Sequence, residues 1–150
     1  MDDKILHNLT DNEVLFLTLI GEARGEPIEG IVGVGCVIRN RLHYSPARYK
    51  GYKDVCLAPF QFSCWNADDD NSGLLLDIAN KLINNQIIND PYLRQCFVVS
   101  NAIAEWSLLD NVKGARYYMT SILFESDKRP SWAKSPVFTL IRGNHTFFNL

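Results

Sequence analysis

The segment that most constrains the fold is residues 20–27, which read IGEARGEP. A mainly apolar run from Val14 to Ile20 leads into this segment and predicts a buried helix. Gly25 favours the end of that helix, and Pro27 fits the first turn of a second one. The sequence therefore predicts two packed helices joined by a tight break.

Glu22 lies between the apolar run and this break. Apolar neighbours disfavour a charged carboxylate, so we expect a raised pKa for Glu22 and a side chain directed into a cleft. The alternative is structural: a glutamate at a helix end pairs with an arginine or caps the next helix. Glu26 and Glu29 are further carboxylates beyond the glycine, which makes their directions unpredictable.

Composition narrows the class of protein. The chain has 150 residues, 47% hydrophobic and 21% charged, which suits one globular domain over residues 1–150. A formal net charge of −2 and scattered basic residues argue against nucleic-acid binding. No apolar run is long enough for membrane insertion. The acidic N-terminus does not resemble a signal peptide, so we expect synthesis in the cytoplasm without a leader.

Periodicity predicts further helices. Thr10 and Glu13 match a capping box, which starts the first helix near Asp11 and ends it near Ala23. The second is expected from Ile28 to about Leu42, with its glycines packed against the first. Two more helices are expected at about 74–87 and about 91–108, whereas 44–58 reads as irregular.

The C-terminal part has a different pattern. Residues 114–119 are short and extended, and 137–141 and 145–148 flank Arg142-Gly143-Asn144, which predicts a β-hairpin. The fold class is therefore α+β, mainly α, with a small antiparallel β-hairpin near the C-terminus.

Three kinds of chemistry compete. Acid–base catalysis by Glu22 would use an aromatic and polar cleft formed by residues 61–66 and by Tyr117 and Tyr118. A thiol site would use Cys64 with His145, as in peptidases that cut wall cross-links. A metal site is disfavoured, because the histidines are scattered and the Asp-rich segment 68–73 lacks the closing glutamate of a calcium loop. No metal and no cofactor is expected.

Residues 19–30, LIGEARGEPIEG, followed by VIRNR at 37–41, resemble the signature of the SleB-type cell-wall hydrolases. Phe62-Ser63-Cys64, then GARYY at 114–118, then GNHTFF at 143–148 resemble the later blocks of that family in the same order. Together these blocks span most of the chain.

The resemblance implies a lysozyme-like, two-lobed catalytic domain that acts on peptidoglycan at the bond between N-acetylmuramic acid (MurNAc) and N-acetylglucosamine (GlcNAc). Glu22 would be the catalytic acid, and Arg24 and Glu26 would support the turn. The expected substrate-binding residues are Gln61, Phe62, Ser63, Tyr117, Tyr118 and His145.

The expected reaction is that of a lytic transglycosylase. The alternatives are a water-using muramidase with a second carboxylate, the Cys64/His145 wall peptidase, and an inactive peptidoglycan-binding or virion structural protein. A compact chain without a leader suggests a phage endolysin, released with the help of a holin, or a lysin carried in a virion. It would act on the wall in the periplasm or outside the cell, as a monomer.

Overall fold

The computed structural model describes residues 1–150 and consists mainly of helices, with a small sheet near the C-terminus. The helices are α1 (Asp3–Asn8), α2 (Asp11–Ala23), α3 (Ile28–Tyr44), α4 (Tyr52–Cys56), α5 (Ser72–Ile83), α6 (Pro91–Ala104) and α7 (Ser121–Glu125), with 3-10 turns η1 (Ser63–Trp65) and η2 (Ser131–Ala133). The strands are β1 (Tyr117–Thr120), β2 (Phe138–Arg142) and β3 (His145–Asn149). The predicted fold class is confirmed.

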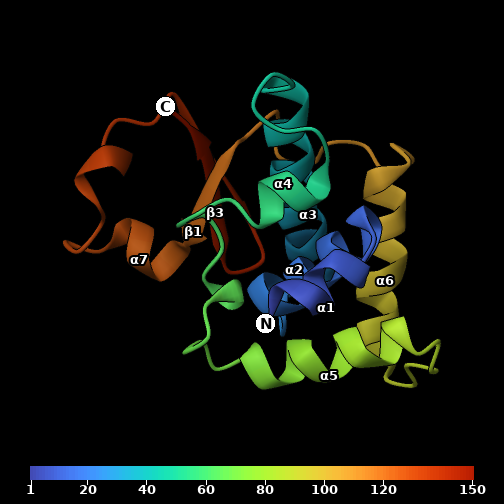
Figure 1. The fold of residues 1–150 in the computed structure, drawn as a ribbon. Coiled ribbons are helices and arrows are strands. Elements are labelled where there is room, and N and C mark those ends of the chain that lie inside the picture. The colour runs from blue at the N-terminus through green and yellow to red at the C-terminus, as the bar shows by residue number, and fades with distance from the viewer.

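Helix α2 runs through the middle of the molecule. It begins with the predicted capping box, in which Thr10 Oγ1 accepts from Glu13 N and Glu13 Oε2 accepts from Thr10 N. The side chains from Val14 to Ile20 are fully buried. Figure 1 shows α2 and α3 in the centre, with α6 on one side and the sheet with α7 on the other. The last turn of α2, which contains Glu22, therefore lies between the helical part and the sheet.

The glycines of α3 serve a different contact from the predicted one. A Cβ on Gly33 would lie 2.6 Å from Phe147 of β3, and one on Gly35 would lie 2.9 Å from Ile103 of α6. Only Gly35 also approaches α2, at 3.7 Å from Leu19. The prediction that these glycines pack mainly against the first helix was therefore wrong. Gly33 allows the sheet to pack closely against α3, and Gly35 allows α6 to do so.

The sheet has three strands in the order β1-β3-β2, and both pairings are antiparallel. The predicted hairpin is present, and its turn contains Gly143 at φ 58°. The extended segment predicted before it supplies β1, whose Tyr118 pairs with Phe147. The sheet is thus one strand wider than the hairpin that the sequence indicated.

Several boundaries differ from the predictions. Helix α5 ends at Ile83 and α6 at Ala104, both earlier than expected. Soon after each end a residue adopts a left-handed conformation, Asn85 at φ 53° and Trp106 at φ 59°, which stops a right-handed helix. The segment read as irregular contains α4, and α1 and α7 were not predicted. These helices have five or six residues, too few for a periodic pattern.

None of the helices is both long enough and apolar enough to cross a membrane. All four cysteines are free and buried, and a buried thiol packs as a small apolar side chain.

Candidate active site

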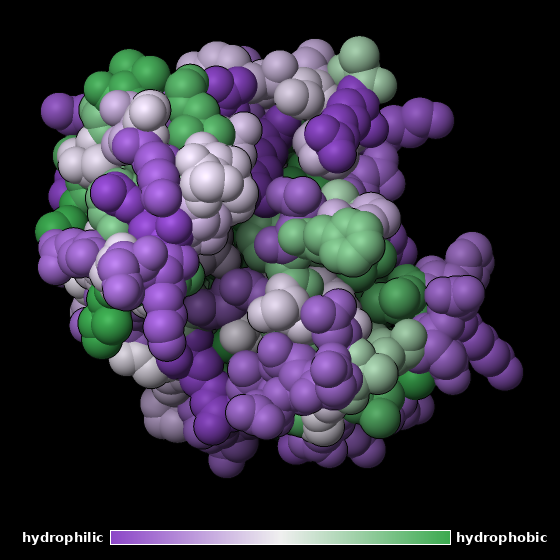
Figure 2. Space-filling model, turned by 90° about the vertical axis from the view of Figure 1, so that its left-hand side faces the viewer, coloured by the Kyte–Doolittle hydropathy of each residue, from purple (hydrophilic) through white to green (hydrophobic).

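A cleft of about 830 Å³ lies between the end of α2, the segment around η1, and the face formed by β1, α7 and η2. Figure 2 shows the molecule hollowed near the middle of this face, with polar and apolar surface around the hollow. The cleft is lined by Glu22, Arg41, Phe60, Gln61, Phe62, Ser63, Asn66, Tyr117, Tyr118, Met119, Thr120, Leu123, Trp132 and His145.

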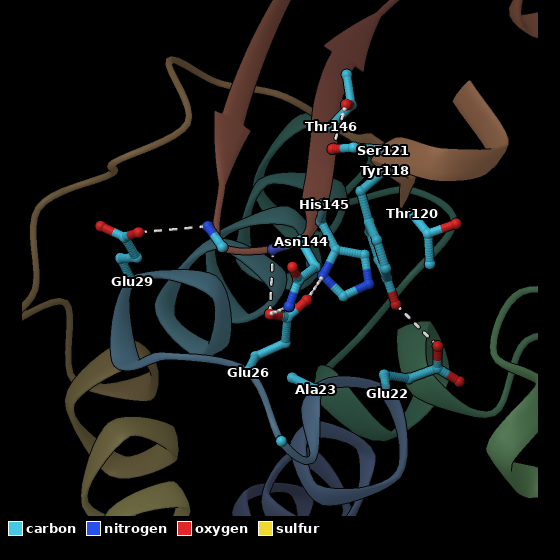
Figure 3. A network of polar contacts seen from close by, with 12 residues as sticks. Glu22, Ala23, Glu26, Glu29, Tyr118, Thr120, Ser121, Asn144, His145 and Thr146 are labelled. Atoms are coloured by element: carbon cyan, nitrogen blue, oxygen red, sulfur yellow. Dashed lines mark hydrogen bonds and ion pairs between the residues drawn. The ribbon is translucent and has the colours of Figure 1, made fainter. Parts of the chain in front are cut away.

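Glu22 reaches the cleft from the last turn of α2, and both its carboxylate oxygens accept hydrogen bonds. Tyr118 Oη donates to Oε2 at 2.9 Å, and the backbone N–H of Cys64 donates to Oε1 at 3.2 Å. Figure 3 shows Tyr118 pointing from β1 toward Glu22. One donor comes from the sheet and the other from η1, so the carboxylate is held from both walls of the cleft.

The close approach of η1 to α2 depends on Gly21. A Cβ at this position would lie 2.4 Å from Cys64 Cβ and 2.7 Å from Cys64 Sγ. Two side-chain hydrogen bonds hold the segment in place: Trp65 Nε1 donates to Thr18 Oγ1, and Asn71 Nδ2 donates to the Gly21 carbonyl. The missing side chain thus lets the Cys64 N–H reach Glu22.

The turn after Glu22 is fixed from α6. Tyr92 Oη accepts from the N–H of Gly25 at 2.9 Å and donates to the carbonyl of Ala23 at 2.7 Å. Gly25 has φ 85°, a conformation that suits glycine. This contact was not foreseen, because nothing in the sequence pairs a tyrosine at 92 with a turn at 25.

Glu26 is buried and connects the same turn to the hairpin. Its Oε2 accepts from the backbone N–H and the side-chain amide of Asn144, at 3.1 and 2.9 Å. Its Oε1 lies 2.5 Å from Nδ1 of His145, although the ring N–H is not aligned for a hydrogen bond. Figure 3 shows Glu26 directed at Asn144 and His145. No residue with a side chain fits at position 143, since a Cβ there would lie 2.7 Å from Glu26 Oε2.

Burial sets the ionisation of several groups around Glu22. It raises the pKa of Tyr118 well above 10, with a further contribution from Glu22, so the phenol stays a donor. It also raises the pKa of the Cys64 thiol, again helped by Glu22. It lowers the pKa of His145, against the opposing influence of Glu26 and Glu22, so this imidazole is neutral at pH 7.

The sequence-based site residues divide into two groups. Glu22, Gln61, Phe62, Ser63, Tyr117, Tyr118 and His145 all line the cleft. Arg24 and Glu26 do not: Glu26 holds the hairpin turn, whereas the Arg24 side chain is exposed and makes no hydrogen bond or ion pair. Glu29 is also exposed and lies outside the cleft lining, where its Oε1 accepts from Gly143 N at 3.4 Å.

Sequence reasoning missed other lining residues, notably Arg41, Phe60 and Trp132. Arg41 lies in the VIRNR block, which contributed to the family resemblance. The direction of its side chain depends on which face of α3 it occupies, and the motif does not indicate that face. Phe60 and Trp132 lie in loops, where no periodicity predicts which way a side chain points.

The site is therefore a cleft with one carboxylate held between aromatic and polar groups, as suits cleavage of a glycan. The sequence profile of the cell wall hydrolase family matches residues 25–148. The chain belongs to this family, and it is a peptidoglycan-degrading enzyme. The match begins just after Glu22, so the role of that residue has to be argued from the site itself.

Two solved structures share the fold. One is the catalytic domain of the germination-specific lytic transglycosylase SleB from Bacillus anthracis, with 21% identity and a TM-score of 0.60 over 93% of each chain. The other is the catalytic domain of the Bacillus cereus SleB protein, with 21% identity, a TM-score of 0.62, and coverage of 95% of this chain and 91% of that one. Among curated proteins, no sequence matches the chain.

Proposed function

We propose that the chain is a lytic transglycosylase that cleaves the β-1,4 bond from MurNAc to GlcNAc, with Glu22 as the single general acid and base. The observation that carries this proposal is that Glu22 is the only acidic residue lining the cleft. The solved structure from Bacillus anthracis that shares the fold is described as a lytic transglycosylase, which agrees with this reaction.

In the first step, the protonated Glu22 carboxyl donates its proton to the glycosidic oxygen, and the bond from that oxygen to C1 of MurNAc breaks. GlcNAc leaves with a new hydroxyl. In the second step, the C6 hydroxyl of the same MurNAc attacks C1, and the Glu22 carboxylate takes its proton. The product is a 1,6-anhydro end, no water is consumed, and Glu22 returns to its protonated form.

The groups around Glu22 support the first proton transfer and line the walls of the cleft. Tyr118 and the Cys64 N–H stabilise the carboxylate formed after the first proton transfer, because each donates a hydrogen bond to it. Gln61, Phe62, Ser63, Tyr117 and His145 line the walls where sugar rings would bind. Aromatic faces next to amide and hydroxyl groups suit such a ligand.

A water-using muramidase would need a second carboxylate in the cleft. Glu26 accepts from Asn144, contacts His145 and is absent from the cleft lining, and Glu29 lies outside as well. Neither is placed to activate a water beside Glu22. The single-carboxylate reaction is therefore favoured over hydrolysis.

A thiol peptidase at Cys64 is disfavoured by the same site. The Cys64 side chain is buried against Gly21, and its pKa is raised, so it does not supply a thiolate. His145 is paired with Glu26 rather than with the thiol. An inactive wall-binding or virion structural protein would not need a carboxylate held by two donors in a cleft.

The biological setting is part of the proposal. Residues 1–150 form one catalytic domain that works as a monomer in phage-type lysis. It reaches the wall through a holin or is carried in a virion. The pI of about 5.9 and the net charge of −2 agree with an enzyme that acts on glycan rather than nucleic acid.

Digestion of purified peptidoglycan, followed by mass spectrometry of the products, tests the reaction. We expect muropeptides that end in 1,6-anhydro-MurNAc and lack a reducing MurNAc end. Reducing MurNAc ends would mean hydrolysis, and intact glycan with cut peptides would mean a peptidase. Glu22→Gln should abolish product formation at an unchanged melting temperature. The matched control is Glu105→Gln, an exposed position outside the cleft, which should digest like the wild type.

A further inference from the structure

Arg41 is a cation in the wall of the cleft that the proposed reaction does not use. It lies in the last turn of α3, and two of its donors are engaged by the protein. Nε donates to the carbonyl of Arg116 at 2.7 Å, and Nη1 donates to Oε1 of Gln61 at 3.0 Å. The guanidinium lies 5.2 Å from the ring centre of Phe62 and 5.9 Å from that of Tyr117. These contacts fix its position.

No carboxylate neutralises this charge. The ion pair of the chain joins Lys81 to Asp77, and the neutral His145 lies against Glu26; neither contact involves Arg41. Nη2 of Arg41 makes no hydrogen bond within the protein, and it is not among the polar atoms sealed in the interior without a partner. Since Arg41 lines the cleft, this remaining donor is open to a ligand there.

The surroundings of Arg41 make a bound anion favourable. Burial lowers the pKa of Arg41, while the nearby tyrosines, led by Tyr118, raise it. An arginine stays charged at neutral pH in spite of such burial. A partly desolvated cation without a counterion is costly, and an incoming carboxylate relieves that cost.

Arg39 shows what a purely structural arginine looks like in the same helix. It is fully buried, its Nη1 donates to the carbonyls of Leu108 and Ile103, and its guanidinium lies 4.3 Å from the ring centre of Trp106. It does not line the cleft. Arg41 differs from it because its free donor faces the space where the substrate would lie.

We propose that Arg41 forms an anion subsite that binds a carboxylate of the glycan strand at the muramyl residue. This inference rests on the proposed function. The guanidinium fork matches a carboxylate in shape and charge. Two sources share this chemistry: the lactyl carboxylate of a peptide-free MurNAc, and a carboxylate of the peptide stem. The lactyl group is attached to the sugar ring itself, so it suits a subsite in the same cleft as Glu22.

The arrangement orients the strand. Tyr118 donates to Glu22 and is close enough to Arg41 to feel its charge, so both groups have this phenol as a neighbour in the cleft. An anion on the substrate is attracted by Arg41, whereas the protonated Glu22 carboxyl offers it no positive charge. MurNAc would therefore bind with its carboxylate toward Arg41, whereas GlcNAc, which has none, gains nothing there. The subsite thus selects peptide-free muramyl glycan over chitin-like glycan.

Titration calorimetry in the Glu22→Gln background tests this assignment without turnover. The ligands are a peptide-free GlcNAc–MurNAc tetrasaccharide, the same tetrasaccharide with lactyl methylamides, a stem-bearing tetrasaccharide, and chitotetraose. We expect the free carboxylate form to bind roughly 10-fold to 100-fold more tightly than the methylamide, as for a charge-assisted hydrogen bond. Added salt should weaken only the carboxylate form.

Adding Arg41→Gln should reduce this preference to within about twofold, and Arg41→Lys should keep part of it because the charge remains. Arg48→Gln removes an exposed charge away from the cleft and should leave the preference intact. Equal binding of carboxylate and methylamide before any change at Arg41, together with salt-independent binding of the stem-bearing ligand, would overturn the proposal, even if the Arg41 variants failed to fold.

The remaining outcomes are also decisive. If only the stem-bearing ligand binds in a salt-dependent manner, the lactyl assignment is wrong and the carboxylate comes from the peptide. If the ligand preference holds but wall digestion yields no anhydro ends, the subsite stands and the proposed reaction fails. The two ideas therefore fail separately.

Discussion

Tyr118 Oη and Glu22 Oε2 are 2.9 Å apart, although their residues are 96 positions apart in the chain. The bond joins the end of α2 to the first strand of the sheet, across the cleft. It is paired with the bond from Cys64 N to the other oxygen, so the carboxylate is held on both sides. Since burial and Glu22 both raise the pKa of Tyr118, the phenol donates this bond throughout the neutral pH range.

Tyr118→Phe should therefore lower kcat more than it changes KM. The ring remains, with its edge contact to His145 at 5.1 Å between ring centres, so the shape of the cleft is kept. Only the donor to Glu22 is lost. Loss of one hydrogen bond to a charged group predicts a decrease in kcat of roughly 10-fold to 100-fold. Initial rates of release of anhydro-muropeptides would measure it.

Tyr44→Phe is the matched control, because Tyr44 is exposed and lies outside the cleft lining. Its rates should equal those of the wild type. If Tyr118→Phe also kept the wild-type kcat, the Tyr118 bond would be structural only.

Gly21→Ala should disturb the site although it replaces no polar side chain. The new methyl would lie 2.4 Å from Cys64 Cβ, which forces η1 away from α2 and takes the Cys64 N–H from Glu22. Overpacking of this kind costs about 1–3 kcal/mol, which outweighs the better helix propensity of alanine. We expect a lower melting temperature in thermal denaturation, together with a lower kcat.

Cys64→Gly in the same chain removes both atoms that the methyl would strike, so the double variant should recover part of the loss. Gly73→Ala provides the comparison, since a Cβ there meets nothing within 4 Å. It should be neutral or slightly stabilising. Additive effects of Gly21→Ala and Cys64→Gly would contradict the steric explanation.

The helices of the core follow from local signals. The capping box at Thr10, the apolar run into Glu22 and the helix beginning near residue 91 are short-range patterns, and the structure contains each of them. The hairpin at Gly143 is equally local, because the turn needs a left-handed residue there. Such features depend on a few neighbouring residues, so a single sequence contains enough to predict them.

The site depends on contacts between distant segments. That Tyr92 fixes the turn at Gly25, that Glu26 holds Asn144, and that Gly21 admits Cys64 all follow from tertiary packing. The glycines of α3 illustrate the difference. The sequence shows that they are small, but it does not show that Phe147 and Ile103 would pack against them. Residue type predicted the chemistry, whereas the partner of each residue required the three-dimensional arrangement.

Cys64→Ala should leave the reaction almost unchanged. The thiol is buried, and burial and the Glu22 charge raise its pKa, so it is a packing group rather than a nucleophile. The backbone N–H that contacts Glu22 is kept. We expect anhydro-muropeptide release within about twofold of the wild type and a loss of stability of about 1 kcal/mol for the buried atom removed. Loss of activity in Cys64→Ala would instead support the hypothesis of a thiol peptidase.

The last prediction concerns the pH dependence of stability and the pair formed by His145 and Glu26. Burial lowers the pKa of His145 in the folded protein, although Glu26 and Glu22 oppose this, while the unfolded chain titrates near the ordinary value of about 6.5. Below that pH, the unfolded state therefore binds the proton more readily than the folded state. The contribution of this group to stability is complete above pH 6.5 and decreases as the pH falls through the folded pKa.

His145→Gln removes this titration, so its free energy of unfolding should depend less on pH than that of the wild type as the pH falls below about 6.5. Glu26→Gln removes the nearest charge that holds the pKa of His145 up, so that pKa should fall further and the dependence should become steeper. Urea denaturation at closely spaced pH values measures both slopes, and His43→Gln, at an exposed histidine, is the control. Identical slopes for the wild type and His145→Gln would show that the imidazole titrates alike in the folded and unfolded states.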